Sequence, residues 1–242
     1  MDAGVAARQL GLIEVAGGQN AQDSSAFTAI SIAFFTEPTG CTEKTTDNCT
    51  IHHCPPSVAP IAYQRAGQIA IAGRVRSYTL SPTDSGAYSK VDSAGPPFFG
   101  GEKVTLSAVG DLVPAFSIDA IAPFQIVSVQ PMIVGGALQV SQSKPLQLSW
   151  AGPPGGEVLG VLTRYSSTGD VTTGYCRFSG EAGSGQLPQS LVQTIAQAAG
   201  ENISFGMISR NQTTKTIGAY SVQLNLTFAP MNTSSGVVTF VP

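Results

Sequence analysis

Two short segments in which apolar and polar residues alternate constrain the fold more than any other feature of this sequence. Residues 146–150 place three large apolar side chains, the last of them Trp150, on one face of a strand. Residues 175–178 repeat the two-residue period and place Cys176 and Phe178 together on one face. A tryptophan strand followed by a cysteine strand, both facing one interior, predicts a sandwich of packed sheets.

The same period recurs along most of the chain and predicts an all-β protein. The segments expected to form strands include 10–15, 26–35, 67–73, 75–80, 104–108, 116–120, 126–129, 158–165, 203–209 and 220–228. One short helix is expected near 188–199, because a proline opens this segment and apolar residues follow at near-helical spacing. Pro123 and Pro131 enclose a short strand that resembles a crossing between two tandem, Ig-like β-sandwich halves. We therefore expect an N-terminal domain of residues 1–123 and a C-terminal domain of residues 124–242.

Composition excludes two classes of function. Charged residues make up 11% of the chain and the net charge is −3, so no cluster of cations is present to neutralise nucleic-acid phosphates. No apolar run approaches the roughly 20 residues of a membrane-spanning helix. Low charge, many hydroxyl side chains and clustered cysteines are typical of an exported protein. Because the first residues do not form a signal peptide, we expect that the export signal was removed and that Met1 was added for expression.

Four cysteines are the most informative candidate site residues, and we expect disulfides among Cys41, Cys49, Cys54 and Cys176. If all four pair, at most one bridge lies within the first three and the other reaches Cys176. That long bridge would close a loop of more than a hundred residues and stabilise the fold by at most about 4–5 kcal/mol. Three connectivities are open, as is a single bridge with two free thiols.

As an alternative to disulfide formation, the segment from Cys41 to Cys54 could form a metal site. Thiolate and imidazole groups are ligands that zinc prefers, and this segment supplies five of them, namely Cys41, Cys49, His52, His53 and Cys54. Their spacing matches no familiar zinc finger, and two adjacent histidines on a strand would point in opposite directions. In the competing interpretation both histidines are surface residues of the loop. If so, no metal or other cofactor is expected.

No catalytic constellation is recognisable in the sequence. The only two histidines are adjacent, and no Gly-x-Ser-x-Gly segment offers a serine nucleophile. Glycoside hydrolysis needs two convergent carboxylates, and nothing in the sequence pairs any of the candidates. These candidates are Glu14, Glu102, Asp111, Asp119, Glu157 and Asp170. No catalytic residue is therefore expected.

Glycine, proline and polar residues mark the segments expected to be turns and loops. They are a turn at 17–20, a cysteine-rich loop at 39–60 and a turn-rich stretch at 81–101. The last of these is the candidate for an exposed recognition loop, with Tyr88, Phe98 and Phe99 as its contact residues. Such aromatic rings could stack on a sugar, so a carbohydrate-binding module is a further alternative.

The order of short motifs along the chain resembles uncharacterised secreted proteins and surface lipoproteins of myxobacterial type. The motifs are the segments 49–54, 66–73, 98–102, 113–116, 148–150, 175–178 and 187–191. The resemblance covers most of the chain and implies an exported bacterial β protein in two parts, but it implies no activity.

Together these patterns favour a non-enzymatic exported protein of the cell surface or extracellular space, with a binding or structural role. Its expected partner is a cell-envelope or extracellular protein or a glycan. The alternatives are a metal-binding protein that uses the segment from Cys41 to Cys54, and a carbohydrate-binding module. Homo-oligomerisation through edge strands is also open, since segment 220–228 could pair across chains if it were uncovered.

Overall fold

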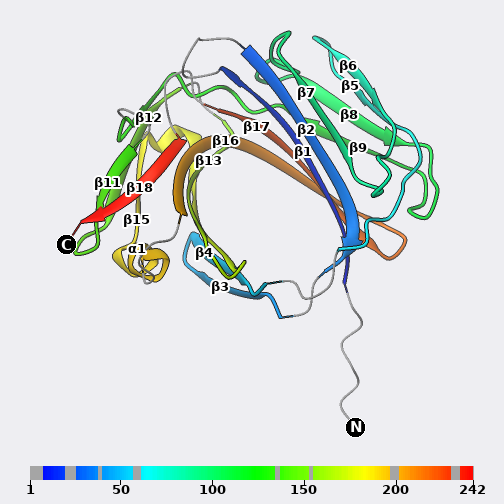
Figure 1. The fold of residues 1–242 in the computed structure, drawn as a ribbon. Coiled ribbons are helices and arrows are strands. Elements are labelled where there is room, and N and C mark those ends of the chain that lie inside the picture. The colour runs from blue at the N-terminus through cyan, green and yellow to red at the C-terminus, as the bar shows by residue number, and fades with distance from the viewer. Residues whose placement is uncertain are drawn as a thin grey trace.

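The computed structural model shows a mostly β protein, with one short α-helix in the part of the chain that it describes (Figure 1). It describes residues 8–19, 26–37, 40–56, 61–133, 137–152, 155–196, 202–229 and 235–241. The all-β prediction is confirmed, and α1 (Gln189–Ala196) lies within the expected segment, whose last residues, 197–199, fall outside the described ranges. In the described ranges no helix is long and apolar enough to cross a membrane.

One long sheet organises the molecule. It runs in the order β3 (Thr42–Thr46), β4 (Cys49–Cys54), β14 (Val171–Ser179), β13 (Glu157–Tyr165), β16 (Asn202–Ile217), β17 (Tyr220–Phe228), β1 (Gln9–Gln19), β2 (Ala26–Thr36) and β7 (Tyr88–Asp92). In the same sheet β18 (Ser235–Val241) pairs with β16 and with β11 (Ala137–Ser141). The pairs β1–β17 and β11–β18 are parallel, and the other pairs are antiparallel. Figure 1 shows this sheet bent into an arch.

Two smaller sheets pack against the long one. The first contains β6 (Ser77–Leu80), β5 (Ile69–Ala72), β8 (Lys103–Ala108) and β9 (Phe116–Ile121). The second contains β10 (Ser128–Gln130), β12 (Leu146–Ala151) and β15 (Ser184–Leu187), which follows the 3₁₀ turn η1 (Gly180–Ala182). In Figure 1 both lie outside the arch, with β12 and β15 on the left and the four-stranded sheet at the upper right.

The first hydrophobic core lies between the four-stranded sheet and β1, β2 and β17. Alternate residues of these strands are apolar and point to the same side, as the two-residue period requires. Phe34 occupies its centre, with its ring edge-on to those of Tyr88, Phe116 and Tyr220. The buried side chains around it include Ile13, Val15, Ile32, Ile69, Leu106, Ile118, Val222, Leu224 and Leu226. This packing of one sheet on another confirms the predicted sandwich.

The second core contains the tryptophan and the cysteine from which the fold was first predicted. Trp150 and Cys176 are both buried in it, and the Trp150 ring centroid lies 5.6 Å from that of Phe178. The Trp150 indole N–H donates to the Gly180 carbonyl over 2.8 Å. Helix α1 closes this core with its apolar side, formed by Leu191, Val192 and Ile195.

The strands do not separate at residue 123 into two independent sheets. Strand β17 comes late in the chain but packs in the first core, and it pairs in parallel with β1. Conversely, β4 comes early in the chain but pairs with β14 over the second core. Whether residues 1–123 and 124–242 are separate domains stays a prediction.

Several local expectations were wrong for identifiable reasons. The cysteine-rich segment is not a loop, because its described part forms the hairpin β3–β4. Gly17 and Gly18 do not form a turn but end β1, where the rings of Phe228 and Phe27 occupy the space that a side chain would need. Segment 220–228 is not an edge, since β16 and β1 flank it. Strand β7 lies within a stretch expected to be turns, and β11, β15 and β18 were not expected.

Expression of residues 1–123 alone tests how far the first core depends on the second half of the chain. We expect this fragment not to unfold cooperatively, because Val222, Leu224 and Leu226, all 0% exposed, would be missing from its core. Circular dichroism during heating, with the full chain as control, measures this. A cooperative transition in the isolated fragment would instead establish residues 1–123 as a domain.

Candidate functional site

All four cysteines form disulfides, one that links the residue before β3 to the end of β4 and one that links β4 to β14. Cys41 pairs with Cys54 across the β3–β4 hairpin, with Cα atoms 4.2 Å apart. Cys49 pairs with Cys176, its direct partner in the β4–β14 register, with Cα atoms 4.0 Å apart. One bridge therefore lies within the cluster and the other links the two halves, which resolves the open connectivity.

The strand period separates the five residues that were considered as metal ligands. Cys49 and His53 face the second core, where Cys49 is bonded to Cys176 and the His53 Nδ1 lies 3.0 Å from the Thr172 hydroxyl. His52 and Cys54 lie on the opposite face of β4, together with Cys41. The five-residue site is therefore not formed. Both sulfurs on the second face are also bonded to each other, so neither is a thiolate ligand.

The predicted recognition loop is exposed at only one of its three aromatic residues. Tyr88 is 1% exposed and donates its hydroxyl to the Gly67 carbonyl, while Phe98 is 0% exposed and packs edge-on against Phe228. Phe99 is 64% exposed. The prediction was wrong for Tyr88 and Phe98, because each points into the first core. The pKa of the Tyr88 hydroxyl is raised, and burial is the largest cause of this shift.

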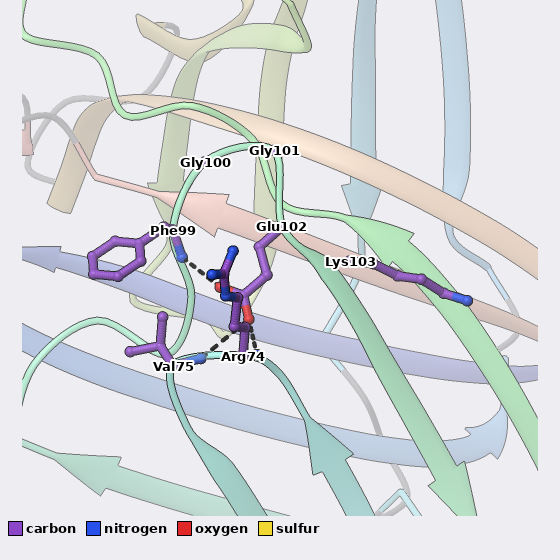
Figure 2. A pocket seen from close by; sticks show the side chains of 7 residues that line it. All are labelled: Arg74, Val75, Phe99, Gly100, Gly101, Glu102 and Lys103. Atoms are coloured by element: carbon purple, nitrogen blue, oxygen red, sulfur yellow. Dashed lines mark hydrogen bonds between the residues drawn. The ribbon is translucent and has the colours of Figure 1, made fainter.

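Glu102 locks the backbone around Phe99. One carboxylate oxygen accepts hydrogen bonds from the Arg74 and Val75 N–H groups, and the other accepts one from the Phe99 N–H over 3.0 Å (Figure 2). The carboxylate thus ties the β5–β6 turn to the segment 96–102, which we call the Phe99 loop. Gly100 is required in this loop, because a Cβ there would lie 2.3 Å from the Phe124 ring.

Phe99 stands at the rim of an open depression of about 760 Å³, which we call the Phe99 pocket. The lining residues are Arg74, Val75, Phe99, Gly100, Gly101, Glu102 and Lys103 (Figure 2). Lys103 is already paired, since its ammonium lies 2.8 Å from Asp119. Hydrogen bonds from Lys103 and then Thr105 lower the pKa of the exposed Asp119 carboxyl. Within the described residues the guanidinium of Arg74 has no ion-pair partner, so its N–H groups are available to bind an anionic ligand.

Two of the scattered carboxylates lie on either side of Arg210, on the face of the long sheet opposite the cores. Glu157 forms an ion pair with Arg210 over 2.9 Å. Glu14 accepts a hydrogen bond from the Thr227 hydroxyl over 3.0 Å, and Thr227 lies beside Arg210 in the register. Burial raises the pKa of Glu14, and Thr227, the charge of Arg210 and Asn225 partly oppose that shift. The arrangement is a charged row across four strands beside a depression of about 480 Å³ that Glu157 also lines.

Sequence reasoning missed several residues of these sites. Arg74, Val75 and Lys103 carry no motif, and only the Gly100-Gly101 pair signals a close backbone approach. Arg210 was also missed, because its partners come from strands that are distant in the sequence. Neither the models of known protein families nor the curated proteins yield a match to this chain.

Replacement of Glu102 by alanine tests whether its carboxylate fixes the Phe99 loop. We expect the free energy of unfolding to fall by about 2 kcal/mol, because three backbone N–H groups lose a charged acceptor. Urea unfolding measures the change, with Glu181→Ala on an exposed part of η1 as the control. An unchanged unfolding midpoint for Glu102→Ala would contradict this role.

Replacement of Glu14 by glutamine tests the buried charge. Its folded pKa is raised above the unfolded value, so the folded state binds more protons between the two values and stability falls as pH rises through that window. Glu14→Gln should therefore stabilise the protein at neutral pH, and its advantage should disappear below the ordinary glutamate pKa of about 4.3. Urea unfolding at both pH values measures this, with Glu181→Gln as the control; a pH-independent difference contradicts it.

Proposed function

We propose that this protein is a non-enzymatic, exported binding protein of the cell surface or extracellular space, and that the Phe99 loop is its contact surface. The observation that carries the proposal is the contrast between two adjacent rings. Phe98 is 0% exposed and anchors the loop in the first core, whereas Phe99 is 64% exposed on backbone that Glu102 holds in place. Rigid aromatic side chains of this kind supply binding energy at low entropic cost.

The disulfides support the assignment to an exported protein. Disulfides persist in oxidising compartments and are rare where thiols are kept reduced. Here one bridge closes the β3–β4 hairpin from the residue before β3, and the other crosslinks β4 to β14. The resemblance to bacterial secreted proteins and surface lipoproteins agrees with the same location.

The partner class follows from the chemistry of the Phe99 pocket. An exposed phenyl ring offers an apolar face, and the Arg74 guanidinium in the same pocket, which has no ion-pair partner among the described residues, offers donors to an anionic group. A cell-envelope glycan that carries acidic groups matches both features better than a neutral one does. The carbohydrate-binding alternative therefore uses the same surface, while an extracellular protein remains the partner if no glycan binds.

The test combines a glycan array with two matched variants. We expect wild-type protein to bind acidic glycans, and Phe99→Ala to weaken that binding about 10- to 30-fold, as loss of an aromatic hot spot does. Tyr165→Ala is the control, because Tyr165 is an aromatic residue that is 52% exposed on β13. Equal binding by wild type and Phe99→Ala would exclude the Phe99 loop as the contact surface.

The non-enzymatic part of the proposal is tested separately. The same preparations are incubated with panels of glycosidic, ester and peptide substrates, and no turnover is expected. Hydrolysis that is lost in Glu14→Gln or Glu157→Gln would replace the binding hypothesis by an enzymatic one centred on the charged row around Arg210.

A further inference from the structure

Three donor groups gather on one face of the β3–β4 hairpin. Cys41 and Cys54 are bonded to each other, and the ring nitrogens of His52 lie 3.7 and 3.8 Å from the Cys54 sulfur. One donor atom from each residue lies within 4.8 Å of the other two. The register also places Glu43 opposite His52, so a carboxylate lies on the same face. We call Cys41, His52 and Cys54 the hairpin cluster.

The two disulfides differ in how accessible they are. Cys49 is 6% exposed and Cys176 is 0% exposed, and both lie in the second core. Cys41 and Cys54 are only half-buried, and the β3–β4 hairpin that they close forms one end of the long sheet. A reductant in solution therefore reaches the hairpin bridge before it reaches the buried one.

The backbone around the hairpin cluster does not depend on the Cys41–Cys54 bridge. Strand β4 is held between β3, along Thr42 to Thr46, and β14, along Val171 to Cys176. The buried Cys49–Cys176 bond fixes the same strand from its other face. Loss of the outer bridge therefore leaves His52 and Cys54 in positions that the sheet defines, with Cys41 one residue before the start of β3.

We propose that the hairpin cluster is a redox-gated site for a thiophilic divalent metal such as Zn²⁺, closed when oxidised and open when reduced. A dithiol reductant gives two electrons and two protons to the Cys41–Cys54 bond, which breaks into two thiols while the dithiol becomes a disulfide. The metal then displaces both thiol protons and forms two sulfur–metal bonds. His52 contributes a nitrogen lone pair and water fills the fourth position. This inference does not rest on the proposed binding function.

The first step is tested by partial reduction and alkylation. Full-length protein is treated with increasing dithiol, alkylated and mapped by mass spectrometry. We expect Cys41 and Cys54 to be alkylated at dithiol concentrations that leave Cys49 and Cys176 paired. Simultaneous reduction of both bridges would overturn the selective gate.

The second step is tested with Co²⁺ as a spectroscopic probe, after removal of the dithiol under argon. Partly reduced protein should bind one Co²⁺ with the visible spectrum of a tetrahedral thiolate site, and Zn²⁺ should bleach it. Oxidised protein, and the double variant Cys41→Ser with Cys54→Ser, should bind none. Equal binding to oxidised and reduced protein would overturn the proposal.

The histidine is tested by a matched pair of variants. His52→Ala should weaken Co²⁺ binding by about 10-fold or more, since even groups that only orient a metal ligand contribute that much. His53→Ala is the control, because His53 lies on the other face of β4 beside Thr172. If both variants bind Co²⁺ as the wild type does, His52 is not a ligand and the proposed site is wrong.

Discussion

The parallel pairing of β1 with β17 is the interaction on which the rest of the structure depends. It joins residues 9–17 to residues 220–228, so the first strand of the chain lies beside its second-last strand in the long sheet. Without it, β1, β2 and β7 would be separated from β17 and from the rest of the long sheet, and the strands that line the first core would no longer be joined. Because such a contact closes a loop of nearly the whole chain, the apolar faces on both strands must offset a large entropic cost. Ile13, Val15, Leu224 and Leu226 do so, each at 0% exposure.

The sequence predicted which residues are buried far better than it predicted which strands meet. Alternation marks the two faces of β17 or β12 without any knowledge of neighbours, because the period is a property of a single strand. Partners depend on distant segments, and so the sharing of strands between the two halves could not be foreseen. Strand β7 escaped prediction for a different reason. It is short, lies at one end of the long sheet and carries Ser89, Lys90 and Asp92, which do not form an apolar pattern.

The candidate sites show the same division between local and long-range information. If all four cysteines pair, counting alone requires that the bond partner of Cys176 comes from the cluster, but the choice of Cys49 follows from the β4–β14 register. The two-residue period then turns His52 and His53 to opposite faces, as expected for neighbours on a strand. Phe98 and Phe99 are likewise separated, one inward and one outward. The sequence indicates that the side chains of adjacent residues point in opposite directions, but only the packing decides which of them is exposed to solvent.

Because adjacent side chains point to opposite faces, the two faces of the short strand β4 have different roles. Through Cys49 and His53, β4 is fastened to the second core, while His52 and Cys54 remain on the face that no core covers. A change in the oxidation of the outer bridge can therefore alter the chemistry of one face without releasing the other. The Phe99 loop lies in a different part of the fold, on the four-stranded sheet, and is held by Glu102 rather than by a disulfide. The proposed binding through Phe99 and the proposed redox chemistry at the hairpin therefore use separate parts of one molecule.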